Sequence, residues 1–308
     1  MSHIYHGLDE VPPGFGPSVV AIGNFDGVHR GHQEILRTVI CEARTRSARA
    51  VAITFDPHPD IVLRPARAPQ ILTPMDQRAR LLLETGIDAV VVLPFDLELA
   101  KLSAREFLER VVVRTLGAIG VHEGENFRFG HKAQGDPRLL AGDGRFETVV
   151  HPLLEVDGEI VSSSHIRGLV LAGELGQANH LLGAPFQLQG DVVHGDERGR
   201  ELGFPTANLI PDEALLYPGH GVYACLSDGR PAAVSIGVRP TFQTGRAELV
   251  EAFIVDFEGD LYGSRLRLEF LERLRGERRV GTPADLVAQM HRDVERTREA
   301  VAAQRPLA

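Results

Sequence analysis

Two histidines stand three residues apart in a glycine-rich stretch near the start of the chain. The stretch runs V-V-A-I-G-N-F-D-G-V-H-R-G-H from Val19, and its histidines are His29 and His32. The apolar run reads as a buried strand, followed by a tight loop and the first turn of a helix. Residues three apart on that turn face one side, where free backbone N–H groups and the helix dipole favour a phosphate. With Gly31 leaving room for a ligand against the backbone, the stretch predicts a nucleoside triphosphate pocket.

Two other interpretations of the histidine pair stay open at this point. A zinc site can use His-x-x-His as half of its ligands, but no Cys, Asp or Glu partner stands at zinc-like spacing, and the glycines would be unexplained. A capped surface helix with incidental histidines is the simpler alternative. The full string G-x-F-D-G-x-H-x-G-H is more specific than either, and it is not a Walker A loop.

Polar segments later in the chain carry further candidate ligand groups. Residues 124–136, G-E-N-F-R-F-G-H-K-A-Q-G-D, mix glycines, aromatics and bases, although a loop with aromatics packed on the core has the same composition. Residues 161–167, V-S-S-S-H-I-R, open a helix that the serines can cap, and Arg167 adds a fixed cation near its N-terminus. A capped helix with an exposed arginine explains that segment equally well.

A third segment, residues 194–208, reads H-G-D-E-R-G-R-E-L-G-F-P-T-A-N. Its glycines allow close backbone approach, its arginines supply positive charge, and Thr206 and Asn208 offer oxygen ligands for a hard cation such as Mg²⁺. The alternative is a solvated hairpin. We expect this segment to be a long polar crossing between two strands.

The first half of the chain alternates strands and helices. The expected strands cover residues 19–22, 50–55 and 89–93, and the expected helices begin near 29, 73 and 103. Continuous apolar strands in this alternation indicate a parallel sheet covered on both faces. In such sheets ligands bind at the carboxyl ends of the strands, which is where the His29 loop falls.

The composition changes after Gly183-Ala184-Pro185, which follows a helix over 175–182. Short strands with frequent turns predict a small antiparallel barrel. Its expected strands cover residues 187–193, 221–226, 232–236, 249–257 and 265–271. A final helix begins at Thr282-Pro283, and its stripe of Leu286, Met290 and Val294 reads as core packing.

Composition limits the classes of function. At 308 residues the chain is expected to form two domains. A net charge of −9 argues against a general nucleic-acid binder. Cys41 and Cys225 are too few and too distant for a disulfide framework, and no apolar run is long enough for a membrane span or a signal peptide. We therefore expect a cytoplasmic protein without nucleic-acid or membrane partners, of unknown oligomeric state.

The motifs taken together resemble a known family. The Gly23–His32 string resembles the HxGH signature of the nucleotidyltransferase superfamily, in the version found in bacterial bifunctional riboflavin kinase/FAD synthetases. Residues 124–136 and 161–167 resemble the family's later adenylyltransferase motifs, and Pro-Thr-Ala-Asn at 205–208 resembles its riboflavin kinase module. This sequence departs from the family pattern in having Ser164 where Thr is commoner and Gly-Glu-Asn in place of Asp-Asp. Both departures keep a polar side chain.

The resemblance implies an α/β Rossmann-like nucleotidyltransferase domain with a parallel sheet, followed by a small antiparallel β-barrel domain with a C-terminal helix. It implies FMN adenylyltransferase in residues 1–184 and riboflavin kinase in residues 185–308. The substrates and products would be riboflavin, FMN, FAD and ATP, with Mg²⁺ as cofactor at both sites.

The resemblance also implies roles for individual residues. His29, His32 and Arg167 would stabilise charge on the phosphates during adenylyl transfer, and Glu251 would be the base of the kinase step. Thr206 and Asn208 would hold the metal. The residues implied in nucleotide or flavin binding are Gly23, Phe25, Asp26, Gly27, Gly31, Asn126, Phe129, Ser163, Ser164, Gly195, Arg198, Thr206 and Asn208.

Two alternative functions follow from the same residues. One is a nucleotidyltransferase for another phosphorylated acceptor, which the Pro-Thr-Ala-Asn loop and Glu251 argue against. The other is a flavin-binding protein without turnover, which the histidines and Glu251 argue against.

Overall fold

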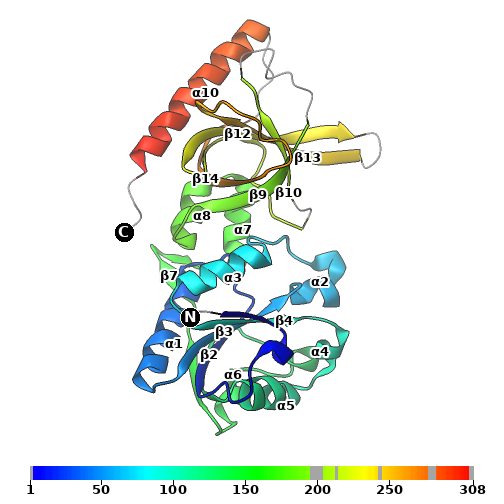
Figure 1. Cartoon of the computed structure of the whole chain (residues 1–308), viewed down its shortest axis with the longest axis vertical. Helices are drawn as coiled ribbons and strands as arrows, with labels where there is room; N and C mark the ends of the chain where they lie inside the picture. The colour runs from blue at the N-terminus through cyan, green and yellow to red at the C-terminus, as the bar shows by residue number, and fades with distance from the viewer. Residues whose placement is uncertain (1–2, 195–203, 212–213, 242–244, 277–281, 305–308) are drawn as a thin grey trace. The chain divides into compact units, whose positions relative to one another are not determined.

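The computed structural model describes residues 3–194, 204–211, 214–241, 245–276 and 282–304 (Figure 1). The chain divides into two compact units, Met1–Ser163 and Ser164–Ala308. Helices α7 (Ser163–Ala172) and α8 (Leu175–Leu182) thus group with the second unit, ahead of the composition change at Pro185. In the described part of the chain, no helix is long and apolar enough to cross a membrane.

A parallel sheet forms the centre of the first unit, and its described strands lie in the order β1-β4-β3-β2-β5-β6. Their bounds are β1 His3–His6, β2 Ser18–Ile22, β3 Arg49–Asp56, β4 Ala89–Pro94, β5 Ala118–Gly124 and β6 Glu147–His151. The predicted parallel sheet is confirmed. Because β2 lies between β3 and β5, the winding direction of the chain reverses at β2, and ligands bind at the carboxyl ends of strands at such a point.

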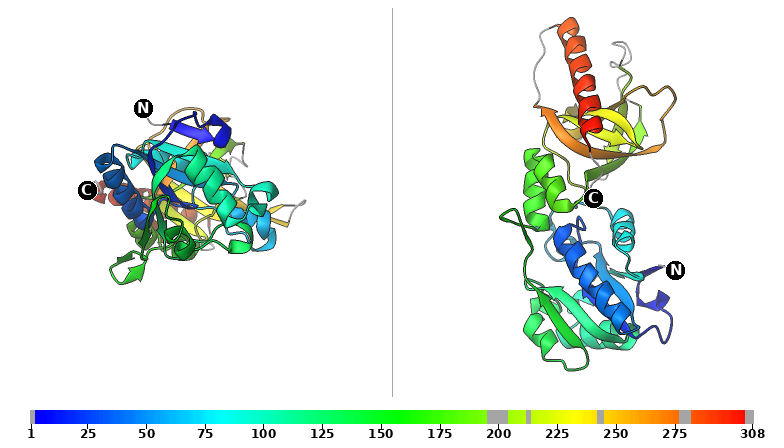
Figure 2. Two further views of the ribbon diagram at one scale, coloured as in Figure 1. Left: turned by 90° about the horizontal axis from the view of Figure 1, so that it is seen from below. Right: turned by 90° about the vertical axis from the view of Figure 1, so that its left-hand side faces the viewer.

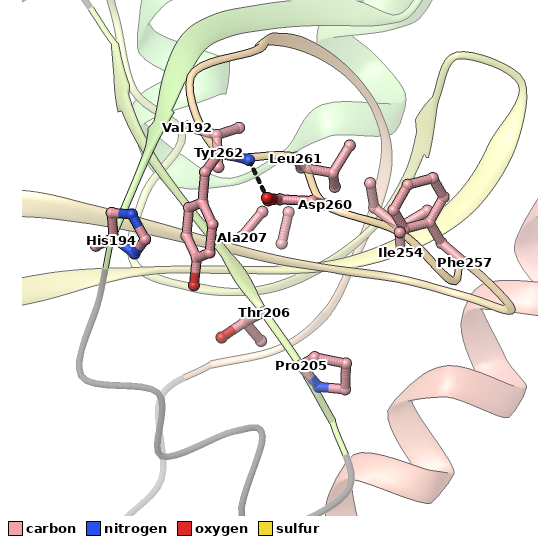
Figure 3. A pocket seen from close by; sticks show the side chains of 12 residues that line it. Val192, His194, Pro205, Thr206, Ala207, Ile254, Phe257, Asp260, Leu261 and Tyr262 are labelled. Atoms are coloured by element: carbon pink, nitrogen blue, oxygen red, sulfur yellow. Dashed lines mark hydrogen bonds between the residues drawn. The ribbon is translucent and has the colours of Figure 1, made fainter.

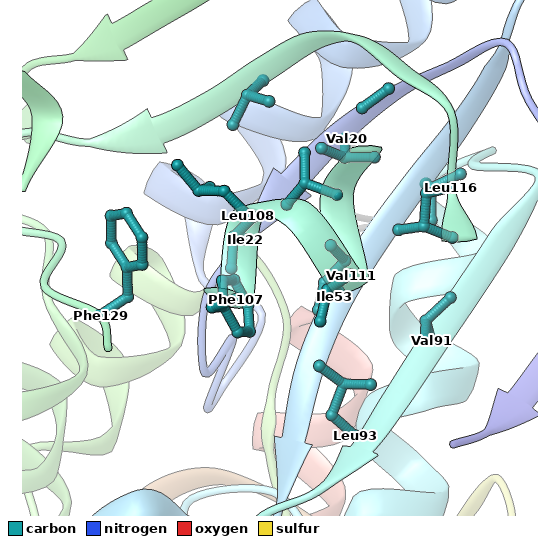
Figure 4. Packing of buried hydrophobic residues seen from close by; sticks show 14 of the residues in the cluster. Val20, Ile22, Ile53, Val91, Leu93, Phe107, Leu108, Val111, Leu116 and Phe129 are labelled. Atoms are coloured by element: carbon teal, nitrogen blue, oxygen red, sulfur yellow. The ribbon is translucent and has the colours of Figure 1, made fainter. Parts of the chain in front are cut away.

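Helices cover both faces of this sheet. Successive side chains of β2 point to opposite faces of the sheet. Val19 and Ala21 pack with α1 (Arg30–Thr45) and α3 (Met75–Glu84) on one face. Val20 and Ile22 pack with α5 (Ala104–Phe107) and η3 (Leu108–Thr115) on the other (Figure 4). The helical segments and remaining short strands of the unit are η1 Leu8–Glu10, α1 Arg30–Thr45, α2 Pro59–Leu63, η2 Pro65–Arg67, α3 Met75–Glu84, α4 Leu97–Lys101, α5 Ala104–Phe107, η3 Leu108–Thr115, η4 His131–Ala133, α6 Pro137–Ala141, β7 Glu155–Val156 and β8 Glu159–Ile160.

Of the helices expected to begin near residues 73 and 103, the second begins as predicted and the first begins two residues later. Ser103 and Glu106 form the expected capping box at α5. Thr73 is not the N-cap of α3, because the helix begins at Met75 with Pro74 in the cap position. The backbone N–H of Thr73 donates to the Asp26 carboxylate at 3.0 Å, so this residue is held by a tertiary contact before the helix begins.

The second unit is a closed antiparallel barrel, as predicted, with its described strands in the order β10-β13-β12-β11-β14-β9. Their bounds are β9 Phe186–Val193, β10 Ala207–Pro211, β11 Gly221–Ser227, β12 Arg230–Thr241, β13 Gly245–Ile254 and β14 Arg265–Arg275. The prediction that residues 194–208 only connect two strands is wrong for the last two residues, which belong to a strand. Strand β10 begins at Ala207 and closes the barrel by pairing with β9 and β13.

Helix α10 (Pro283–Ala303) lies along the outside of the barrel (Figure 2). Thr282 caps it as predicted, and Val294 packs with Phe204 and Val255. Asp293, 5% exposed, pairs with Arg275 of β14 at 2.8 Å, which fixes the helix against the barrel wall.

Candidate functional site

His29 and His32 lie where β2 delivers the chain to α1. His29 is the N-cap of α1, and its Nδ1 accepts a hydrogen bond from the backbone N–H of His32 at 3.4 Å. The two imidazole rings stack with their centroids 3.6 Å apart and their planes at 16°. Both rings therefore occupy one side of the first helical turn, as their spacing predicts.

The charge of this pair decides what it offers to a ligand. Burial lowers the pKa of His32 well below 6.5, and repulsion by His29 and Arg78 lowers it further. His32 is therefore neutral at pH 7. Because Nδ1 of His29 accepts a hydrogen bond, a neutral His29 carries its proton on Nε2. Both histidines can therefore offer N–H donors to a ligand.

The loop before the histidines has an unusual backbone. Phe25, Gly27 and Val28 all have positive φ angles, of 50°, 87° and 41°. A β-branched residue in this region is strained, and burial of the Phe25 and Val28 side chains holds it there. Gly31 also has a definite role, since a Cβ at that position would lie 3.3 Å from the His29 ring. The missing side chain makes room for the imidazole.

Asp26 is buried, and the protein itself uses its carboxylate. The two carboxylate oxygens accept from the backbone N–H groups of Leu72 and Thr73 at 3.0 Å each, and the Arg78 guanidinium lies 3.7 Å away. The Asp26 carbonyl accepts from Ser163 Oγ at 2.9 Å. Asp26 therefore ties three segments of the first unit to the His29 loop.

Sequence reasoning missed a second set of polar residues beside this loop. The Asn24 carbonyl accepts from Thr54 Oγ1 and from Arg78 Nη1, at 3.0 Å in each case. The Asn24 amide nitrogen lies 3.1 Å from Nε2 of His58, which follows the carboxyl end of β3. The signal was present in T-F-D-P-H-P at 54–59, since polar residues after a buried parallel strand reach the ligand edge of the sheet.

Asn126 and Phe129 follow the carboxyl end of β5 and differ in exposure. Asn126 is exposed on the turn after the strand. Phe129 is only 7% exposed and packs between Phe107 and Phe127, with ring centroids 5.8 and 5.5 Å away. The structure therefore places Phe129 in the core, as the alternative interpretation of this segment expects. The implied contact of Phe129 with the flavin stays a prediction.

Ser163 begins α7, and Ser164 and Arg167 follow it in the second compact unit. Ser163 and Arg167 are four residues apart, so they share one face of the helix. Of the remaining candidates in the second unit, Gly195 and Arg198 lie outside the described residues.

Glu123 is a buried acid that the sequence did not single out. It is 1% exposed on β5, and neither carboxyl oxygen has a hydrogen-bond partner within the described residues. Burial raises the pKa of Glu123 to about 8, the charge of Asp136 adds to this, and Arg128 opposes it. The carboxyl group is therefore largely protonated at neutral pH.

We expect Glu123 to make the first unit less stable as pH rises. Its folded pKa is above its ordinary value of 4.5, so between about 4.5 and 8 the folded state binds a proton that the unfolded state has released. The free energy of unfolding that the protonated Glu123 contributes below this pH range is therefore lost as pH rises through it. Glu123→Gln cannot ionise, so thermal unfolding of this variant should depend less on pH there, by a few °C or more.

Glu155→Gln, on an exposed strand of the same unit, is the matched control. It should follow the parent chain at every pH. An E123Q variant with the parent's pH dependence would show that Glu123 does not ionise in this window.

In the barrel, three predicted or adjacent polar residues come together across neighbouring strands. Asn208 of β10 lies directly opposite Glu251 of β13, and Glu251 lies opposite Ser235 of β12. Side chains opposite each other in an antiparallel pair point to the same face, about 5 Å apart. The structure thus brings Asn208 and Glu251 together, although they are far apart in sequence.

A cavity of about 550 Å³ opens beside these strands (Figure 3). Thr206 lies in its wall, and the rings of His194 and Tyr262 stack at its edge with centroids 3.7 Å apart. Ala252 and Ile254 also line it. Since side chains alternate along β13, Glu251 points to the opposite face of the barrel wall from the cavity.

Comparison with known proteins matches both units. A family model for FAD synthetase matches residues 13–165, and one for riboflavin kinase matches residues 182–301. The chain is 35% identical over 287 residues to the bifunctional riboflavin kinase/FMN adenylyltransferase of Listeria monocytogenes, covering 91% of each chain. It is 36% identical over 302 residues to the Escherichia coli K12 protein of the same name, covering 96% of this chain and 95% of that one.

The chain belongs to the bifunctional riboflavin kinase/FMN adenylyltransferase family. As a member, it phosphorylates riboflavin with ATP to give FMN, and it adenylylates FMN with a second ATP to give FAD and pyrophosphate. The two alternative functions considered from the sequence, another phosphorylated acceptor and a flavin-binding protein without turnover, are set aside by these matches.

A solved structure shares the fold of this chain. It is a chain from Streptococcus pneumoniae described as a macrolide-efflux protein, with a TM-score of 0.87 and 31% identity over 96% of this chain and 98% of that one. The likeness covers both the parallel-sheet unit and the barrel.

Proposed function

We propose that FMN adenylylation takes place at the His29 turn, within a domain of residues 1–184. An oxygen of the FMN phosphate attacks the α-phosphorus of ATP and forms the new P–O bond, while the bond to pyrophosphate breaks. The attacking group is already an anion, so no protein nucleophile is needed. His29 and His32 would donate N–H hydrogen bonds to the charge that develops on the phosphates, and Arg167 would add a cation.

The nucleotide in this site would be positioned by Asn126, Ser163 and Ser164. The exposure of Asn126 at the carboxyl edge of the sheet supports this role. The hydrogen bond from Ser163 to the carbonyl of Asp26 supports it as well, since it holds Ser163 at the His29 loop within the first unit. Gly23, Phe25 and Gly27 would act by shaping that loop.

We propose that riboflavin phosphorylation takes place in a domain of residues 185–308 with Glu251 as the base. Glu251 would take the proton of the ribityl hydroxyl as its oxygen bonds to the γ-phosphorus, and ADP would leave. The observation that carries this proposal is the direct cross-strand placement of Asn208 and Glu251. It puts an expected metal ligand and the expected base on one face.

The two faces of the barrel wall suit the two substrates. The cavity beside Thr206 has a volume in the usual range for ligand pockets, so we place the nucleotide there. The opposite face carries Glu251 and Phe253, and Phe253 packs with Phe204 under α10. We therefore place riboflavin on the face that carries Glu251, between the barrel wall and α10.

The residues of the barrel site fit Mg²⁺. A hydroxyl and an amide oxygen, from Thr206 and Asn208, are hard ligands of the kind this ion prefers. Thr206 precedes the first residue of β10, so the alternation of side chains along that strand does not separate its hydroxyl from the face of Asn208. Within the described residues, no three His, Cys, Asp or Glu side chains are grouped to hold a metal. Mg²⁺ in such sites usually takes one or two ligands from the protein, and phosphate oxygens of ATP and water supply its other ligands. When bound, the ion would neutralise phosphate charge.

The metal proposal predicts the behaviour of Asn208→Ala. Removing the amide oxygen should raise the Mg²⁺ concentration needed for riboflavin phosphorylation by about tenfold or more, since one ligand commonly contributes more than 1.4 kcal/mol. FAD formation from supplied FMN should keep the parent's Mg²⁺ dependence. The measurement is chromatographic separation of flavins after reaction with ATP at graded Mg²⁺.

Two outcomes would contradict this assignment. An N208A variant with an unchanged Mg²⁺ requirement would remove Asn208 from the metal site. Formation of FMN at the full rate in the presence of excess chelator would remove the metal from the kinase step altogether.

The working environment of the chain stays an expectation. We propose the cytoplasm, where ATP is available and thiols remain reduced. The free thiols of Cys41 and Cys225 support this placement.

A further inference from the structure

A hydrogen-bonded chain of three titratable residues, centred on a buried histidine, crosses the first unit, and none of the roles proposed above uses it. His122 of β5 is fully buried and uses both ring nitrogens. Nε2 lies 2.8 Å from Oε2 of Glu42 on α1, and Nδ1 lies 2.9 Å from Nε2 of His151 on β6. We call Glu42, His122 and His151 the β5 histidine relay. It connects a helix to two neighbouring strands.

The bond between His122 and Glu42 has a definite direction at neutral pH. Burial works to raise the pKa of Glu42, but hydrogen bonds from His122 and Arg46 outweigh it and hold the pKa below 4.5. The ionised carboxylate can only accept, so His122 donates to it from Nε2. Burial and His122 lower the pKa of His151, against the opposing charge of Glu34. One proton shared between Nδ1 of His122 and Nε2 of His151 closes this second bond.

Charged neighbours hold the relay in place. Arg46 lies 2.8 Å from Oε1 of Glu42 and 3.3 Å from Oε2 of Glu147 on β6. Gly120 of β5 leaves room for this packing, because a Cβ at that position would displace Oε1 of Glu42 from where it lies. The carboxylate is therefore enclosed by β5 and fixed on both oxygens.

The far end of the relay supports the turn that carries Asn126. The backbone carbonyl of His151 accepts from the N–H of Glu125 at 2.9 Å, and Oε1 of Glu125 accepts from the N–H of Leu153 at 3.2 Å. The N–H of Phe127 donates to the carbonyl of Gly124 at 2.9 Å and closes the turn. Asn126 lies at its exposed apex. Thus the relay joins this turn to α1, the helix that begins at His29.

We propose that His122 is a positioning residue for FMN adenylylation, which fixes the Asn126 turn relative to α1 through Glu42 and His151. The proposal rests on the nucleotide-positioning role of Asn126 proposed above. The turn follows β5 directly, and its Glu125 N–H donates to the carbonyl of His151 on the edge strand β6, so the side-chain bond from His122 to His151 holds the strand that the turn leans on. Small displacements of positioning groups are costly, since about 1 Å can reduce a rate 100-fold.

The test is a double-mutant cycle in the full-length chain with His122→Leu and Asn126→Ala. We expect H122L to lower kcat for FMN adenylylation about 10- to 100-fold and to leave riboflavin phosphorylation unchanged. If His122 acts through Asn126, then H122L should have little further effect in the N126A background. A purely structural role would instead give losses that multiply.

Two further variants keep this test decisive. His151→Leu removes only the outer bond of the relay and should show the same dependence on Asn126, so it replaces H122L if that variant does not fold. His6→Leu makes the same change at the exposed opposite edge of the sheet and should leave both activities unchanged.

The outcomes separate the two proposals. Multiplying losses in the cycle, or full adenylylation by both H122L and H151L, would overturn the positioning role and leave that of Asn126 intact. A fully active N126A variant would refute the role of Asn126, and the inference about His122 would fall with it.

Discussion

Replacing His29 and His32 together by alanine should almost stop the conversion of FMN to FAD and leave the conversion of riboflavin to FMN intact. The loss of one preorganised donor to transition-state charge typically costs a factor of about 10² to 10³. The two imidazoles stack on one helical turn with their ring centroids 3.6 Å apart. Together their N–H donors should therefore account for most of the adenylylation rate. The measurement is the initial rate of FAD formation from FMN and ATP, with riboflavin phosphorylation on the same preparation as the internal control.

The N-cap position of His29 requires a separate control. Loss of an N-cap side chain costs about 0.5 to 2 kcal/mol of stability, so an alanine at position 29 could act by loosening α1. His29→Asn restores a capping acceptor without restoring the imidazole. If the imidazole is the chemical group, H29N should be as stable as the parent and nearly as inactive as His29→Ala.

The neutral state of His32 adds a pH expectation. Because burial keeps the pKa of His32 well below 6.5, its N–H donor persists at alkaline pH, and the adenylylation rate should not fall between about pH 7 and 9 through loss of its proton.

The variant with alanine at both positions 29 and 32 also has an outcome that would contradict the assignment. Equal losses of both activities in the folded double variant would show that the histidines do not belong to one site.

The fold was predictable from the sequence wherever burial alone decides the structure. The strands of the parallel sheet are near-continuous apolar runs, and a parallel sheet covered on both faces requires such runs. Strand β10 was not predictable in this way. Asn208 lies inside it, on the face shared with Glu251, so a polar residue interrupts the apolar pattern.

The candidate sites were predictable as motifs but not as contacts. His29 and His32 follow from their spacing on one helical turn. The parts played by Asp26 and Gly31 do not, because Asp26 binds backbone groups of a segment more than forty residues away, and Gly31 makes room for a ring two positions earlier. His122 and Glu42 meet only through the tertiary fold, and no local pattern in the sequence points to such a pair.

Glu251→Gln should reduce riboflavin phosphorylation by a factor of about 10² to 10⁴, the usual contribution of a general base, and leave FAD formation from supplied FMN unchanged. The amide keeps the size of the side chain and its place opposite Asn208 and Ser235, so binding of riboflavin should survive. The loss should therefore appear in kcat rather than in KM. The measurement is FMN formation at saturating ATP and Mg²⁺ over a range of riboflavin concentrations.

The pH dependence of this variant distinguishes a base from a structural acid. A carboxylate that accepts a proton in the transition state gives the parent enzyme a decline in rate at low pH, and E251Q should lack that decline because the amide does not titrate. Glu258→Gln, on an exposed loop after the same strand, should keep both the rate and the pH profile of the parent. If E251Q phosphorylates riboflavin at the parent's rate, the base lies elsewhere. The pairing of Asn208 with Glu251 would then be a feature of barrel closure alone.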